Sequence, residues 1–161
     1  MSSATDTAAR PRSGQLATFR LDGDLYGVEV EHVQEVLRSQ GLTRVPLAPS
    51  AVAGLINLRG QVVTTLDLRR RLGLSPRSDD EAEATPSTSV VVRWQNEVWS
   101  LVVDRIGDVI EVAEDLFEPP PDTLHGGVRE LITGAYKLDG QLLLMLDMRQ
   151  LLVVGEALAS R

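Results

Sequence analysis

Apolar and polar residues alternate along most of this chain, and a period of two is typical of strands with one buried face. Two such runs, 16–21 and 25–30, flank the letters "DGD", and aspartate and glycine tolerate the positive φ angles of a two-residue hairpin turn. Similar pairs of runs flank "RGQ" and "DGQ"; they are 55–58 with 62–66, and 135–138 with 142–146. The pattern therefore predicts three β-hairpins.

Short stretches with helical spacing interrupt these strands. In "EHVQEVL" (31–37) the apolar residues recur at i, i+3 and i+4, which predicts a short helix. Asp67 and Asp147 each stand where the N-cap of a short helix is expected, and Gly73 is placed to end the first of these helices. Many short strands separated by turns indicate a β-barrel or sandwich with a few short helices.

The chain also repeats itself. Residues 53–72 align with 133–152 without a gap, and eight of the 20 aligned pairs are identical. A second match aligns 24–37 with 97–110. We infer a tandem duplication of a unit of roughly 75 residues, which is too few copies for a solenoid but enough for two similar subdomains.

The repeat predicts how the chain is divided. We expect a disordered N-terminal tail at 1–14, a folded region at 15–154 and a C-terminal tail at 155–161. The two subdomains are expected at about 15–76 and 87–154, each building most of a small barrel, with a strand near either end open to exchange between them. Residues 75–89 between the copies are polar and acidic, with two prolines, and predict a linker that does not bury itself.

Composition excludes several classes of protein. The chain has 161 residues, no cysteine and a formal net charge of −7. The absence of cysteine rules out disulfides and thiolate metal sites and suits a reducing cytoplasm. No signal peptide or membrane-spanning run is visible, and the negative charge argues against binding nucleic acid or anionic membranes. The run "RRR" (69–71) is interpreted as a solvated helix face.

No constellation of residues indicates catalysis. The two histidines, His32 and His125, are far apart in the sequence, and neither has a second ligand at metal spacing. The letters "LHGG" (124–127) lack the G-x-S-x-G motif that would supply a nucleophile, and no phosphate-binding glycine motif occurs. The sequence therefore predicts no enzyme and no catalytic, cofactor-binding or metal-binding residues.

The segments "LYGVEVEHVQEVL", "LTRVPLAPSAVAG" and "GLINLRGQVVTTLDLRRRLGL" resemble the CheW family of chemotaxis coupling proteins. The resemblance covers about 15–154 and implies two five-stranded SH3-like barrels packed on each other, without catalytic activity. The same module occurs in the CheA kinase and in CheV proteins. This chain has no kinase ATP site and no room for a receiver domain, so it resembles the free-standing adaptor.

The resemblance implies a cytoplasmic adaptor that couples chemoreceptors to the CheA histidine kinase and is recruited to receptor arrays at the membrane. Its implied partners are the regulatory domain of CheA and the helical cytoplasmic tips of the receptors, with CheW–CheW or CheW–CheA rings in arrays. The alternative is a scaffold of the same fold in a chemosensory system that controls surface motility or gene regulation. The sequence alone does not separate these pathways.

Positions that differ between the two copies are the candidates for binding. Arg59 on a hairpin tip aligns with Asp139, and Glu35 aligns with Asp108. In the family the matching glutamate and arginine form a pair beside the receptor groove, and arginine is favoured in binding hot spots. In the alternative, Arg59 is a solvated turn residue and the apolar residues of 31–37 pack in the core. The spacing of the residues does not exclude this alternative. The predicted receptor-binding residues are Val33, Glu35, Val36, Leu37, Asn57, Arg59 and Gly60.

Overall fold

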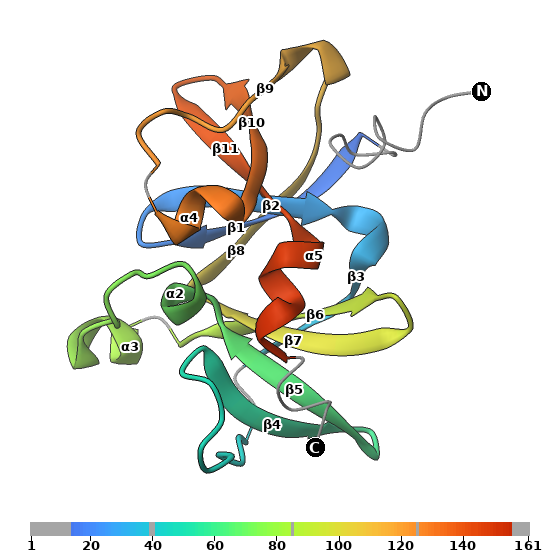
Figure 1. The fold of residues 1–161 in the computed structure, drawn as a ribbon, viewed down its shortest axis with the longest axis vertical. Helices are drawn as coiled ribbons and strands as arrows, with labels where there is room; N and C mark the ends of the chain where they lie inside the picture. Colours follow the sequence, from blue (N-terminus) through green and yellow to red (C-terminus); the bar gives the residue numbers. More distant parts are fainter. Residues whose placement is uncertain (1–13, 39–40, 85, 125, 156–161) are drawn as a thin grey trace.

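The computed structural model describes residues 14–38, 41–84, 86–124 and 126–155, and its strands form two sheets, one above the other in Figure 1. Sheet A, the upper one, has the order β8-β1-β2-β11-β10-β9, and sheet B has the order β3-β6-β7-β5-β4. The strands of sheet A are β1 (Gln15–Leu21), β2 (Asp24–Glu29), β8 (Arg105–Glu111), β9 (Phe117–Glu118), β10 (Ile132–Leu138) and β11 (Gln141–Leu146). Those of sheet B are β3 (Val33–Arg38), β4 (Val52–Leu58), β5 (Gln61–Asp67), β6 (Thr88–Trp94) and β7 (Glu97–Val103). The predicted mostly-β architecture is confirmed, with one strand more in sheet A than the five predicted.

Each sheet contains strands from both copies of the repeat. The β1–β2 hairpin lies in sheet A beside β11, and the β6–β7 hairpin lies in sheet B beside β5. Both joins are parallel, whereas the other strand pairs of the two sheets are antiparallel. The copies therefore exchange a whole hairpin rather than a single strand. The copy boundaries inferred from the repeat stay a prediction, and the predicted tails lie almost entirely outside the described residues.

The three predicted hairpins are confirmed by antiparallel pairing of β1 with β2, β4 with β5, and β10 with β11. In the turn between β1 and β2, Asp22 and Gly23 have φ angles of 54° and 87°. Arg59 and Gly60, between β4 and β5, have φ angles of 52° and 87°. Two successive positive φ angles characterise the tight turn whose twist matches that of the flanking strands.

The predicted N-caps of two short helices, and the end of the first, are confirmed, while other short helices were not predicted. They are α2 (Leu68–Arg71), α3 (Asp79–Ala84), α4 (Gly127–Glu130) and α5 (Met148–Leu151), with 3-10 turns η1 (Val30–His32), η2 (Glu114–Leu116) and η3 (Leu152–Gly155). The carboxylates of Asp67 and Asp147 accept hydrogen bonds from backbone N–H groups of α2 and α5 and so act as N-caps. Gly73 has a φ of 76°, and its N–H donates to the carbonyl of Arg70. Gly73 therefore ends helix α2 with the left-handed backbone conformation that glycine commonly adopts directly after a helix.

The predicted helix at 31–37 is wrong. The chain makes only the short turn η1 and then strand β3, which pairs with β6 through Val36 and Val90. A six-residue segment with this spacing of apolar residues fits either a helix or a strand, and pairing with β6 makes it a strand here. In the strand the exposure alternates, so Glu35 and Leu37 are half-buried while Val36 is exposed, and the expected apolar stripe is divided between two faces.

The linker contains a helix that the sequence analysis did not predict. Helix α3 buries none of its residues. Its first turn is closed reciprocally: the N–H of Glu81 donates to Ser78 Oγ at 3.2 Å, and the N–H of Ser78 donates to Glu81 Oε1 at 3.0 Å. This is the capping box of an S-x-x-E sequence. Strand β6 begins at Thr88, within the stretch predicted as linker.

Three clusters of buried apolar residues hold the sheets. One lies within sheet A and includes Tyr136 and Leu143, and one lies within sheet B and includes Ile56 and Val63. The largest draws on both sheets and on helices α2 and α5, with Phe19, Leu66, Leu101, Leu146 and Leu151 among its members. The two sheets therefore share a core between them, in addition to the cluster that each one holds.

Two equivalent glycines let a neighbouring segment approach the edge of each sheet closely. A Cβ at Gly134 would lie 2.4 Å from Phe117 Cζ and 2.5 Å from the carbonyl oxygen of Glu118, in strand β9. A Cβ at Gly54 would lie 2.4 Å from the carbonyl oxygen of Thr43, which forms an isolated bridge to β4. Identity at these two positions of the repeat is thus explained by packing.

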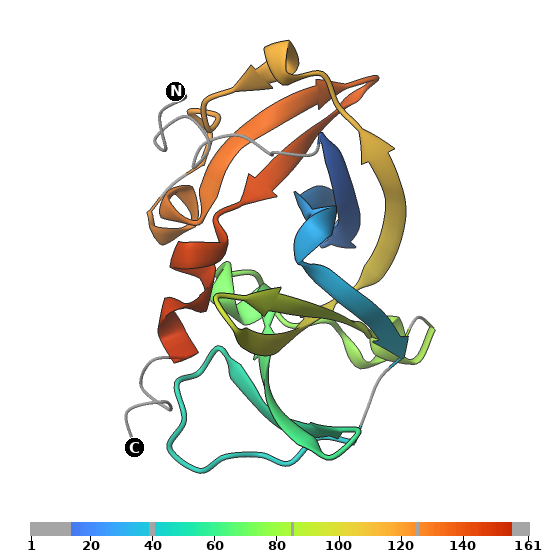
Figure 2. The same cartoon turned by 90° about the vertical axis from the view of Figure 1, so that its right-hand side faces the viewer.

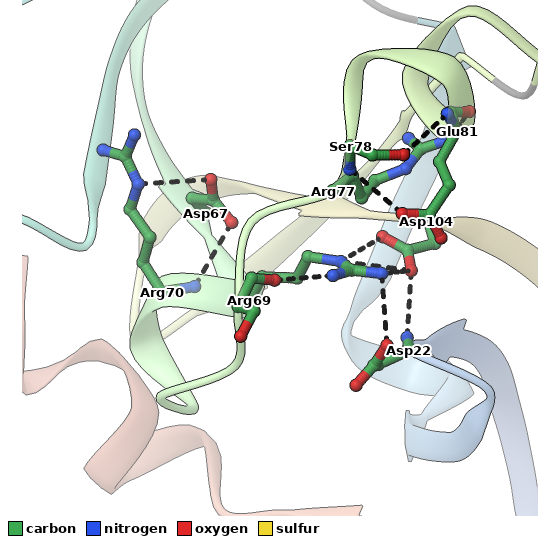
Figure 3. A network of polar contacts seen from close by, with 9 residues as sticks. Asp22, Asp67, Arg69, Arg70, Arg77, Ser78, Glu81 and Asp104 are labelled. Atoms are coloured by element: carbon green, nitrogen blue, oxygen red, sulfur yellow. Dashed lines mark hydrogen bonds and ion pairs between the residues drawn. The ribbon is translucent and has the colours of Figure 1, made fainter.

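A polar network joins the two sheets near the linker (Figure 3). Arg69 on α2 makes a double hydrogen bond to Asp104, with Nε–Oδ1 and Nη2–Oδ2 distances of 2.9 and 2.7 Å. Asp104 lies between β7 and β8 and also accepts a hydrogen bond from the backbone N–H of Asp22, in the β1–β2 turn of sheet A. The Arg69 side chain is only 9% exposed. The two-pronged geometry of guanidinium and carboxylate suits this position, where three segments of the chain meet.

The interpretation of "RRR" as a solvated face is wrong for two of its three arginines. Arg69 is buried as described, and Arg71 donates to the backbone carbonyls of Gln150 and Leu151 at the end of α5, at 2.8 and 3.0 Å. Burial lowers the pKa of Arg71. Only Arg70 is exposed. Their partners lie far along the chain, so local spacing did not indicate them.

We expect Asp104→Asn to destabilise the protein by about 2 kcal/mol at neutral pH, a value between those for exposed and fully buried ion pairs. The value is intermediate because the pair borders an open pocket of about 280 Å³. Burial raises the pKa of Asp104, but hydrogen bonds from Arg69 and Asp22 outweigh it and lower the pKa overall. The stabilisation is therefore present above the unfolded pKa of about 4 and is lost as pH falls through the folded value.

Urea unfolding at several pH values measures this effect. Arg149→Ala, an exposed change at the arginine equivalent to Arg69, is the matched control and should have little effect. Equal stability of Asp104→Asn and the wild type at neutral pH would contradict a stabilising role of the pair.

We also expect Gly134→Ala to lower the free energy of unfolding by about 1–3 kcal/mol, the usual range for overpacking. The reason is that the new methyl group meets β9. Gly127→Ala is the matched control, since nothing lies within 4 Å of a Cβ there. Equal thermal stability of the two variants would contradict the close approach of β9 and β10.

Candidate functional site

The two residues singled out for binding meet in the structure. Arg59, on the tip of the β4–β5 hairpin, donates a hydrogen bond from Nη2 to Oε2 of Glu35 on β3 and forms an ion pair with it. Strands β3 and β4 are the two outer strands of sheet B, so this pair bridges the open edges of the sheet. The hydrogen bond and charge of Glu35 raise the pKa of the Arg59 guanidinium.

The turn that carries Arg59 is built by its neighbours. Asn57 Oδ1 accepts a hydrogen bond from the N–H of Gly60 at 2.9 Å, and Gly60 supplies a positive φ at no steric cost. Arg59 also has a positive φ, and its side chain remains 66% exposed. A positive φ is unfavourable for a residue with a Cβ, and strained backbone at an exposed side chain motivates a hypothesis of function. The role of Asn57 and Gly60 is therefore to stabilise the turn that carries Arg59.

The apolar candidates on β3 divide into buried and exposed. Val33 packs against the shared core, and Leu37 packs against the cluster of sheet B, so core packing accounts for both. Val36 is 46% exposed. On this strand the surface therefore presents Val36 on one face, and Glu35 with its arginine partner on the other.

The structure adds apolar surface that the sequence analysis did not select. On β8, Ile106 and Val109 are 44% and 58% exposed. Strand β8 is an outer strand of sheet A, as β3 is of sheet B, and both strands lie on the right-hand side of Figure 2. The alignment of 24–37 with 97–110 places Val109 opposite Val36 and was the signal that could have found it. Each sheet thus exposes an equivalent valine on an outer strand.

Residues able to bind a metal ion come together at one place in the described part of the chain. The carboxylates of Glu29 and Glu31 and the imidazole of His32 have ligand atoms within 4.8 Å of one another. Sequence spacing offered no second ligand for His32; the η1 turn brings these side chains together. His125 lies outside the described residues. Among the helices described, none has the length and apolar character to span a membrane.

Comparisons with known proteins agree on one family. A family model described as a CheW-like domain matches residues 15–156. The chemotaxis protein CheW of Bacillus subtilis is 31% identical over 144 residues, which cover 88% of each chain. Protein FrzA of Myxococcus xanthus is 39% identical over 117 residues, covering 70% of this chain and 68% of FrzA.

A crystal structure of the scaffolding protein TtCheW from Thermoanaerobacter tengcongensis has the same fold. Its TM-score is 0.72 at 28% identity, with 82% of this chain and 87% of TtCheW covered. The match confirms the predicted fold of two SH3-like barrels with short helices. With a family model that spans nearly all of the folded region, the chain belongs to the CheW-like family of chemotaxis scaffold proteins.

Proposed function

We propose that this protein acts without catalysis, by holding the cytoplasmic tip of a chemoreceptor and the regulatory domain of a CheA-type kinase together in a cytoplasmic array. The exposed Arg59–Glu35 pair is the observation that carries the proposal. Its guanidinium is fixed at one end by Glu35 and still reaches solvent, so it can donate to a partner's carboxylate. The B. subtilis relative is named a chemotaxis protein and covers 88% of this chain, which supports a role in chemotaxis.

The proposed receptor surface combines this pair with the exposed valines of the outer strands. Val36 follows Glu35 on β3 and is exposed on the opposite face of that strand, so the proposed surface runs along the outer edge of β3, and Val109 lies on β8. Apolar side chains rimmed by charge suit the apolar face of a helical partner, and the receptor tip is a helical hairpin in this family. The remaining predicted residues contribute indirectly: Asn57 and Gly60 shape the turn, and Val33 and Leu37 support β3 from the core side.

We expect Arg59→Ala to weaken binding of a receptor cytoplasmic fragment by about thirtyfold, the size of a hot-spot loss, with a melting temperature close to that of the wild type. Arg59→Lys should recover only part of the affinity, because lysine lacks the two-pronged fork. Asp139→Ala is the matched control, since it changes the equivalent residue of the other barrel. Binding is measured by isothermal titration calorimetry.

A double-mutant cycle tests the pairing itself. If Glu35 orients Arg59, then Glu35→Ala combined with Arg59→Ala should weaken binding by less than the two single losses added together. Unchanged affinity in Arg59→Ala would return this arginine to the role of a solvated turn residue that bridges the edges of sheet B.

The contribution of β8 has its own test. Val109→Ser removes apolar contact from an exposed position and should weaken receptor binding several-fold without changing the fold. Leu116→Ser is the control, because Leu116 is 48% exposed but lies on η2, outside strands β3 and β8. Equal losses in both variants would remove β8 from the proposed surface.

A further inference from the structure

The turn η1 marks the point where the chain leaves sheet A and enters sheet B, between β2 and β3 (Figure 2). Glu29, Glu31 and His32 lie at this crossover, with Glu29 Oε1 and His32 Nε2 3.8 Å apart. A 3-10 turn has three residues per turn, so side chains at i and i+3 fall on the same side. This spacing aligns Glu29 with His32.

Two of the three side chains are held by the protein. Those of Glu29 and His32 are 20% and 21% exposed. The His32 ring packs edge-on against Trp94 of β6, with ring centroids 5.2 Å apart. Such packing restricts the orientation of the imidazole and keeps its Nε2 near the carboxylates, while Glu31 stays at the surface.

The repeat supplies an independent argument for a cation here. The equivalent crossover, between β7 and β8, places Asp104 at the position of Glu31, and there the buried guanidinium of Arg69 binds the carboxylate. At η1 the arginine equivalent to Arg69 is Arg149, which is exposed. No ion pair between described residues joins it to Glu31. One crossover thus has a carboxylate with a guanidinium, and the other has two carboxylates with an imidazole.

We propose that Glu29, Glu31 and His32 bind a divalent transition-metal ion of the Zn²⁺ type at this crossover. Imidazole nitrogen with carboxylate oxygens is a donor set that zinc accepts. Bonds of about 2.0–2.2 Å require ligand atoms about 3.3 Å apart, and the ligand atoms here lie within 4.8 Å of one another, so binding requires these side chains to move closer together. Three protein ligands leave one position for water. The ion would link the end of β2 to the η1 turn, directly before strand β3.

The test titrates Zn²⁺ into metal-free protein by isothermal titration calorimetry. We expect one site per chain and a rise in melting temperature on binding, as for any ligand of the folded state. His32→Ala should weaken binding by at least about tenfold, since changes even to residues behind a metal's ligands have effects of this size. Glu31→Gln should weaken binding too. Because Glu31 is exposed, this variant still tests the site if His32→Ala destabilises the fold through loss of the Trp94 contact. His125→Ala, at the other histidine, is the matched control and should bind normally.

Absence of Zn²⁺ binding to the wild-type protein at concentrations well above that of the protein would overturn the proposal. So would equal affinity in His32→Ala and the wild type, or a loss of binding in His125→Ala alone, which would place the metal elsewhere. Receptor binding is measured separately, so either result leaves the proposed docking surface independently testable.

Discussion

Two parallel strand pairs, β2 with β11 and β5 with β7, hold the exchanged hairpins in place, and the other features of the molecule depend on them. Through these pairs each sheet is completed by the other copy of the repeat, and the largest apolar cluster forms between the sheets rather than inside one. The hydrogen bonds of Arg69 and Arg71 lie along the same junction. The relative position of the two barrels is therefore set by the chain's own pairing, which suits the proposed adaptor role.

The proposed binding surface uses the parts of the sheets that pairing leaves open. Outer strands carry unpaired backbone groups and invite association with other chains, and proteins commonly protect them with charged side chains. Here β3 carries Glu35 and Arg38 beside Val36, and the Arg59 bridge crosses from the opposite edge of the sheet. The same charges that limit unspecific strand pairing remain accessible for a specific partner. Equivalent valines on β3 and β8 extend this surface across both sheets.

Local signals in the sequence predicted the hairpins, the N-caps and the end of α2, because turn and cap residues act within a few positions of themselves. The repeat and the family resemblance predicted the two barrels, and the Glu35–Arg59 contact followed from the same resemblance. The helix at 31–37 failed because a short valine-rich window has no preference until β6 pairs with it. The burial of Arg69 depends on Asp104, 35 residues away and brought close by the exchange, and no local pattern carries such information.

The exchanged hairpin also has a consequence during synthesis of the chain. Tyr26 of β2 pairs with Leu144 of β11, so the β1–β2 hairpin emerges from the ribosome more than a hundred residues before its partner strand. At roughly 5–20 residues per second this delay is on the order of ten seconds, far longer than a hairpin needs to form. During this time the apolar face of the β1–β2 hairpin remains exposed to solvent. Production of this protein should therefore depend on chaperones more strongly than its small size suggests, and chains that stop at the linker should be removed by proteolysis.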